Sequence, residues 1–197
     1  MNDLVKQDAP TPVARAKISA GGQIAAMIPT DIESCFRLAQ AIASSGMAPK
    51  AYGTDPNKVM VGILAGLEIG IAPFQALQSI AVINGNPTVW GDGALALVQA
   101  SGLLVDMDET FDEQTNTATV RLERVGRSTP IVRSFSYDDA KKAGLLNKQG
   151  PWSQYPRRMA QMRARAFGLR DGFADVLKGM RIAEEVQDYA PEIPVVA

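Results

Sequence analysis

The hydrophobic pattern changes to a strand period near residue 103, and this change constrains the fold more than any other feature. Val120 and Leu122 alternate with Arg121 and Glu123, as in a sheet with one solvated face. The pattern predicts three strands, over residues 103–111, 117–125 and 131–135. This part of the chain is therefore expected to form a sheet with one buried face.

Helical patterns lie on both sides of these strands. Thr30 or Asp31 can cap a helix that runs to about residue 45, and Asp55-Pro56 can begin another that runs through residue 67. Further helices are predicted over residues 94–100, 136–143 and 155–172, with a final turn at 182–186.

A β-hairpin is predicted between the second and third helices. Asn84-Gly85, a strong turn signal, separates the apolar residues 80–83 from the strand-like residues 88–90. Pro87 has no N–H group to donate, which places the returning strand at a sheet edge or the proline at the strand's start.

The predicted helix over residues 55–67 is apolar on almost every side, which indicates burial. Gly62, Gly66 and Gly70 follow one another at four-residue spacing. A glycine inside a helix costs roughly 1 kcal/mol relative to alanine, so close approach of another backbone explains the pattern better than chance. This glycine-striped helix is also a candidate surface for self-assembly.

Composition excludes several classes of chemistry. The chain has no histidine, which rules out Ser-His or Cys-His catalysis and imidazole-ligated metal sites, and Cys35 is its only cysteine. Neither a Gly-x-x-x-x-Gly-Lys loop nor a Gly-x-Gly-x-x-Gly motif is present. No apolar run approaches the ~20 residues that span a bilayer, and the N-terminus lacks a signal peptide's apolar region. We therefore expect a cytoplasmic protein that does not hydrolyse nucleotides.

One domain is the simplest division of a chain of 197 residues. Residues 1–20 contain two prolines and no sustained hydrophobic period, and are predicted to form a flexible arm. Residues 21–187 are then expected to form a single domain, followed by a short tail over residues 188–197.

Positive charge is concentrated in one segment. The thirty-one residues between Asp139 and Asp171 carry no acidic side chain, although the whole chain has a net charge of −1. The basic residues there are Lys141, Lys142, Lys148, Arg157, Arg158, Arg163, Arg165 and Arg170. Trp152 and Tyr155 lie among them, and arginines interleaved with aromatic side chains suit phosphate contact and base stacking. These basic residues and Trp152 are the predicted DNA-binding site, with a solvated helix face as the alternative.

The predicted helix over residues 155–172 sorts its side chains by face. One apolar face is formed by Met159, Met162, Ala166, Leu169 and Phe173. Arg158 and Arg165 lie along one flank of that face. Arg163 and Arg170 lie along the other flank, and Arg157 points away. Arginines that repeat every two turns can follow a row of phosphates.

Structural roles remain open for some of these residues. Arg163 and Arg170 could instead pair with Glu68 or Asp171. Trp152 could be a core anchor rather than a stacking platform.

The acidic residues near the predicted strands allow a different function. Carboxylates are the usual ligands of a catalytic divalent cation, and the candidates here for a metal-dependent nuclease are Asp106, Asp108, Asp112 and Glu123. A solvated hairpin end explains the same residues without any chemistry.

Three blocks of the sequence resemble the RecT/Red-beta family of phage single-strand annealing recombinases. The first is the helix from Lys58, which ends in Gly-Leu-Glu-Ile-Gly-Ile-Ala-Pro and is followed by Ala76-Leu77. The second is the hairpin that runs into Trp90 and the helix that ends in Gln-Ala-Ser-Gly at residues 99–102. The third is Gly150-Pro151-Trp152 with the basic, alanine-rich helix after it. The chain departs from the family at Gly91-Asp92, where members often carry a basic residue.

The resemblance implies an α+β fold in which a small antiparallel sheet with a β-hairpin packs against several helices. It implies a protein that is not an enzyme, binds single-stranded DNA without ATP, anneals complementary strands and assembles into rings or helical filaments. The implied partners are single-stranded DNA, the annealed duplex, further copies of the chain and a phage exonuclease, in the bacterial cytoplasm and without a membrane. No cofactor is required, and Mg²⁺ acts only by screening phosphates. A structural phage protein that self-assembles without binding DNA is a further alternative.

Overall fold

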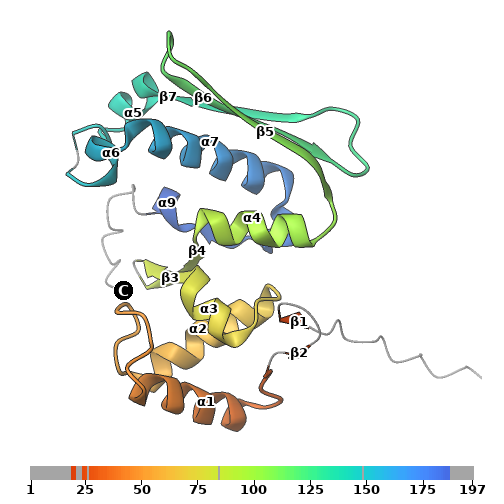
Figure 1. The fold of residues 1–197 in the computed structure, drawn as a ribbon, viewed down its shortest axis with the longest axis vertical. Helices are drawn as coiled ribbons and strands as arrows, with labels where there is room; N and C mark the ends of the chain where they lie inside the picture. The colour runs from red at the N-terminus through yellow and green to blue at the C-terminus, as the bar shows by residue number, and fades with distance from the viewer. Residues whose placement is uncertain (1–18, 21–23, 26, 84, 148, 187–197) are drawn as a thin grey trace, which may run out of the picture.

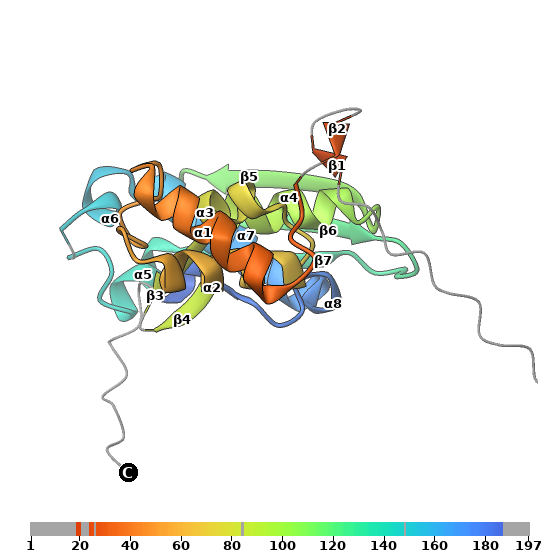
Figure 2. The ribbon, with the colours of Figure 1, turned by 90° about the horizontal axis from the view of Figure 1, so that it is seen from below.

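The structure is a computed structural model that describes residues 19–20, 24–25, 27–83, 85–147 and 149–186. The long helix α7 (Pro156–Gly172) lies between a three-stranded sheet and a second layer of helices with a smaller sheet (Figure 1). Helices α1 (Ile32–Ser44) and α2 (Pro56–Glu68) lie at the end of the molecule opposite the larger sheet (Figure 1) and are in front when the molecule is seen from below (Figure 2). Strands and helices are segregated along the chain, so the predicted α+β fold class is confirmed.

The larger sheet contains β5 (Leu104–Asp112), β6 (Thr117–Arg124) and β7 (Ile131–Ser136), antiparallel and in that order. The three predicted strands are confirmed, with small differences at their ends. Val120 and Leu122 of β6 are fully buried against α7, because alternate side chains of a strand point to the same face. The other face of the sheet is polar.

A row of small side chains allows α7 to lie close to the sheet. This row is formed by Ala160, Ala164, Gly168 and Gly172. A Cβ atom added to Gly172 would lie 2.4 Å from Cδ1 of Ile131, so no larger side chain fits there. The predicted apolar face around Met162 and Leu169 is buried as well. The expectation of two exposed flanks is wrong, because α7 is covered on two sides.

Two arginines fasten the larger sheet to the C-terminal end of α7. Arg124 of β6 donates two hydrogen bonds, of 2.7 and 2.6 Å, to Asp175 in α8 (Ala174–Leu177). Arg133 of β7 donates one of 2.7 Å to Asp171. Both pairs are partly exposed, so they fix orientation more than they add stability.

The smaller sheet is built on the predicted hairpin. β3 (Ile80–Ile83) pairs with β4 (Asn86–Val89) in antiparallel fashion, and β8 (Arg181–Ile182) adds to β4 in parallel. β4 is therefore the central strand and not an edge. Pro87 lies near its start, and β8 pairs with only the last two residues of β4, so the missing N–H group leaves this ladder intact.

The remaining helices follow the predictions with two differences. They are α4 (Gly91–Ala100), α5 (Tyr137–Lys142), α6 (Pro151–Gln154) and α9 (Ala183–Val186). α4 begins earlier than predicted, where the carboxylate of Glu184 accepts from the Gly91 N–H group. Tyr155 separates α6 from α7, because its backbone (φ −135°, ψ 55°) is not helical.

Helices α1 (Ile32–Ser44), α2 (Pro56–Glu68) and α3 (Pro73–Ser79) form a second hydrophobic cluster beside the main core. Asp31 caps α1 as predicted, accepting a hydrogen bond of 2.7 Å from the Ser34 N–H group. Among the described residues no single helix is long and apolar enough to cross a membrane, although α2 and α3 meet that criterion as a pair bent by 100°. Strands β1 (Ser19–Ala20) and β2 (Ile24–Ala25) pair near the start of the described chain. The predicted arm and tail fall almost wholly outside the described residues.

Two of the three striped glycines are sites of close contact. The predicted approach of another backbone occurs at Gly66, whereas Gly62 faces the side chain of Tyr52. A Cβ atom would lie 2.5 Å from Cε1 of Tyr52 if it were added to Gly62, and 2.2 Å from Cβ of Ala76 if it were added to Gly66. Gly70 lies beyond the helix, with φ +86°. The contacts of Gly62 and Gly66 are internal and both residues are buried, so their groove is not a surface for self-assembly.

Replacing Gly66 with alanine should destabilise the protein by about 1–2 kcal/mol. The overpacking against Ala76, typically 1–3 kcal/mol, outweighs a gain of about 1 kcal/mol in helix propensity. Urea unfolding followed by circular dichroism measures the change.

The double variant Gly66→Ala with Ala76→Gly is the control, because it returns the space that the new methyl group takes. It should be more stable than Gly66→Ala alone. If the second change destabilises the protein by a further ~1 kcal/mol, as an isolated helix glycine would, the close contact does not limit this position.

Candidate nucleic-acid interface

The structure divides the predicted basic site into two groups. The inner arginines are Arg163 and Arg165, which are buried, and Arg170, which is half-exposed but pairs with a buried acid. The outer cations, Lys141, Lys142, Arg157 and Arg158, are exposed around the start of α7. Lys148, also predicted to bind DNA, lies outside the described residues.

Arg165 is clamped between two other elements. Its guanidinium donates hydrogen bonds of 2.7 and 2.6 Å to both carboxylate oxygens of Glu109 in β5, and one of 3.0 Å to Asp92 in α4. The Arg165 side chain is only 8% exposed. These hydrogen bonds raise its pKa further above the ordinary value. Arg165 cannot contact a phosphate in this conformation, which corrects its predicted pairing with Arg158 on an exposed flank.

Arg163 and Arg170 meet a buried acid on α9. Arg170 donates a hydrogen bond of 2.5 Å to Glu185, whose side chain is 2% exposed. Arg163 is buried, with its guanidinium 5.7 Å from the ring centres of both Phe135 and Phe167. Burial raises the pKa of the Glu185 carboxyl, although the charges of Arg170 and then Arg163 oppose the rise. The open alternative of ion-pair roles holds for Arg170. Its Nε lies 3.9 Å from a carboxylate oxygen of Asp171, one of the two predicted partners, but its main partner is Glu185 and not Glu68.

The contacts of Glu184 explain why Gly91-Asp92 follows Trp90 in this chain. Its carboxylate lies 2.9 and 3.0 Å from the Gly91 nitrogen at the start of α4, and burial raises its pKa. A Cβ atom on Gly91 would lie 2.8 Å from Cε of Met162. The two residues after Trp90 thus join α4 to α7 and α9, and neither offers a positive charge.

Trp152 is a core residue. Its side chain is 4% exposed, and its ring centre lies 6.0 Å from that of Phe135 in a tilted arrangement. The predicted role as a stacking platform for bases is therefore corrected, because the indole face is covered by protein. The core-anchor alternative is the one that the structure shows.

Arg157 is exposed, but its guanidinium already contacts two other side chains. Its guanidinium donates a hydrogen bond to Glu113 and lies 4.8 Å from the ring centre of Phe111. Both partners belong to the β5 end of the larger sheet, so this arginine fastens α7 to the sheet. An exposed pair of this kind exchanges partners at low cost, and a phosphate could compete with Glu113.

Lys141, Lys142 and Arg158 are exposed and form no ion pair with another residue of the described chain. α5 places its acidic residues in the first turn and both lysines in the last turn, in accord with the helix dipole. α5, α6 and the start of α7 lie at one end of the molecule (Figures 1 and 2). Tyr155 is at the same end and is 65% exposed. We call these four residues the basic end.

Three of the four acidic residues proposed as nuclease ligands have separate local roles, and the fourth, Asp108, is exposed. The Asp106 carboxylate accepts from the Met107 N–H group at 2.9 Å. Asp112 accepts from two N–H groups of the β5–β6 turn, which lower its pKa. Glu123 pairs with Arg121 at 2.5 Å. Within the described part of the chain, no three acidic or cysteine side chains gather closely enough to hold a metal ion.

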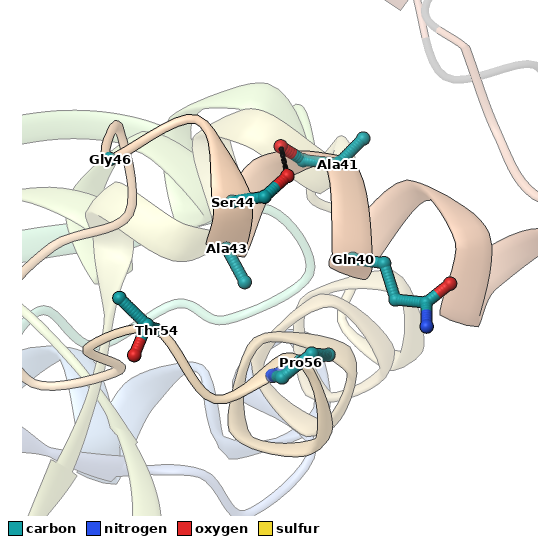
Figure 3. A pocket seen from close by; sticks show the side chains of 7 residues that line it. All are labelled: Gln40, Ala41, Ala43, Ser44, Gly46, Thr54 and Pro56. Atoms are coloured by element: carbon teal, nitrogen blue, oxygen red, sulfur yellow. Dashed lines mark hydrogen bonds between the residues drawn. The ribbon is translucent and has the colours of Figure 1, made fainter.

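A cavity between α1 and α2 carries no charged side chain among its lining residues. It has a volume of about 580 Å³ and lies between the end of α1 and the start of α2. Figure 3 shows its lining of small neutral side chains, in which the Ser44 hydroxyl donates 3.1 Å to the Ala41 carbonyl oxygen. Nothing in this lining suits a phosphate, a nucleotide or a catalytic step.

Searches against protein families and against curated protein sequences found no match to this chain. The family resemblance thus depends on the three sequence blocks alone. In the structure, α2 of the first block contacts β3 of the hairpin in the second block, and Gly91 of the second block packs on Met162 of the third. Sequence analysis missed the acidic partners of the inner arginines, and it missed the small-residue row of α7, which its four-residue spacing could have revealed.

Arg165→Ala should destabilise the protein by about 3–5 kcal/mol, because it leaves Glu109 partly buried without its counter-charge. Arg158→Ala, seven residues earlier on the same helix, is the matched control and should unfold like the wild type. Thermal and urea unfolding of both variants test whether the basic segment divides into structural inner arginines and exposed outer cations. Equal stability of the two variants would show that Arg165 is not structural.

The change of the free energy of unfolding with pH should also report the protonation of Glu185. A raised pKa in the folded state means that its contribution is fully present below about pH 4.5, the ordinary value, and is lost as the pH rises through the folded value. Glu185→Gln removes this contribution. The stability of the wild type relative to this variant should therefore increase as the pH falls from about 7 to 4.5, measured by urea unfolding. A difference that is constant over this range would contradict the raised pKa.

Proposed function

We propose that this protein binds single-stranded DNA and anneals complementary strands without covalent catalysis. The observation that carries the proposal is the basic end, where Lys141, Lys142 and Arg158 are exposed and form no ion pair within the described chain, beside an exposed aromatic ring. Cations attract the phosphate backbone of any sequence, and aromatic rings stack on any base. No regular array of side chains suited to base edges accompanies them, which favours binding without sequence preference.

The packing of the three resembling blocks supports the same proposal. The third block lies far along the chain from the first two, which are consecutive, yet Gly91 of the second block packs on Met162 of the third. A fold that brings them together is the expected result if the resemblance is genuine.

Annealing also requires self-assembly, because a protomer of this size covers only a few nucleotides. Neighbouring copies that share one strand gain affinity through multivalency. We propose a ring or helical filament on DNA, formed in the cytoplasm of a bacterial host. The annealed duplex and a phage exonuclease are the further proposed partners, and neither ATP nor a catalytic metal is needed.

Replacing Lys141, Lys142 and Arg158 together with glutamine should weaken binding to a labelled oligonucleotide and leave the melting temperature unchanged. Three lost phosphate contacts should make the slope of log affinity against log salt shallower by about 2. The matched control replaces Lys50, Lys58 and Arg127, which are equally exposed elsewhere, and should retain the wild-type slope. An equally large loss of affinity in the control would show that the basic end is not the DNA-binding site.

Mixing complementary oligonucleotides with the protein tests the function itself. Annealing should accelerate without ATP and in the presence of a chelator. Cleavage of the strands on addition of Mg²⁺ would instead indicate a nuclease. Failure to shift single-stranded DNA on a gel, with assembly intact, would indicate a purely structural protein.

A further inference from the structure

Tyr155 is the most exposed aromatic residue in the described part of the chain. Its side chain is 65% exposed, and Phe74 on α3, at 55%, is the only other aromatic residue among the exposed large side chains there. In the described structure its hydroxyl makes no hydrogen bond and its ring meets no other aromatic ring. An exposed ring of this size can bury a large apolar area against a partner.

The backbone that carries this ring is fixed by hydrogen bonds on both sides of Tyr155. The Tyr155 N–H group donates 2.7 Å to the Pro151 carbonyl oxygen, which closes α6. Its own carbonyl oxygen accepts 3.0 Å from the Met159 N–H group, which opens α7. Pro156 follows directly and restricts the chain further. A side chain with two torsions on such a backbone loses little entropy when it binds.

The surroundings of the ring indicate what covers it. Arg158 lies three residues later, at the third position of the helix whose N-cap is Tyr155, and the N-cap and third positions of a helix are close in space. The cations of α5 lie at the same end of the molecule (Figures 1 and 2). An apolar partner would gain nothing from these charges, whereas a nucleotide presents a flat base beside a phosphate.

We infer that Tyr155 is the base-stacking platform of the DNA site, in the place that sequence analysis gave to Trp152. The inference rests on the proposed function. One base of the bound strand lies on the phenol ring, and the phosphates next to it contact Arg158 and the lysines of α5. The role belongs to the ring and not to the hydroxyl group, so phenylalanine can replace tyrosine there.

Stacking and charge have different signatures in a binding experiment. Tyr155→Ala should weaken binding to an oligothymidylate roughly 5- to 100-fold with an unchanged salt slope, since no ionic contact is lost. Tyr155→Phe should bind like the wild type. Phe74→Ala, which removes the other exposed aromatic ring, is the matched control and should also bind like the wild type.

An oligonucleotide of abasic sites completes the test, because it keeps the phosphates and lacks the bases. The wild type should bind it more weakly than oligothymidylate, and Tyr155→Ala should bind the two with more nearly equal affinity. Wild-type affinity of Tyr155→Ala for oligothymidylate would overturn the inference and leave the proposed function standing. An equal loss in Phe74→Ala would overturn it too. If the wild type binds neither oligonucleotide, the proposed function itself fails.

Discussion

The clamp on Arg165 is the interaction on which the arrangement of layers depends. One guanidinium on α7 is bonded to Glu109 in the larger sheet and to Asp92 at the start of α4. The Arg165–Glu109 pair lies largely out of solvent, so removing one partner would cost much of the stability of the fold. The two parallel hydrogen bonds of the pair also fix the geometry of both side chains. The clamp therefore sets the position of α7 relative to the elements on both of its sides.

A helix as basic as α7 can occupy the centre of the fold because each inner charge meets an acid from elsewhere. The acidic side chains come from three different elements and are Glu109, Asp92 and Glu185. Small residues on the face toward the sheet, such as Gly168, let the strands approach the helix axis. The positive charge that remains for a ligand is thus concentrated at the N-terminal end of α7 and on α5.

Local signals in the sequence predicted most of the elements. Alternation around Val120 located the larger sheet, and Asp31 and Pro56 marked the starts of two helices. The pairing of Arg165 was not predictable, because Glu109 and Asp92 are 56 and 73 residues away and nothing nearby marks them as partners. A helical wheel also treats every flank as open to solvent, so it could not distinguish Arg165 from Arg158. Trp152 was misplaced for the same reason: its burial depends on Phe135, a residue of another element.

Covalent labelling of lysine and arginine side chains, with and without single-stranded DNA and read by mass spectrometry, tests the central claim most directly. The claim is that the basic segment contains structural arginines inside the fold and DNA-contacting cations at one end. Arg158, Lys141 and Lys142 should react in the unbound protein and become protected by DNA, while Arg163 and Arg165 stay unreactive in both states. Ready labelling of Arg165 in the unbound protein, or no protection of Arg158 at saturating DNA, would contradict the account.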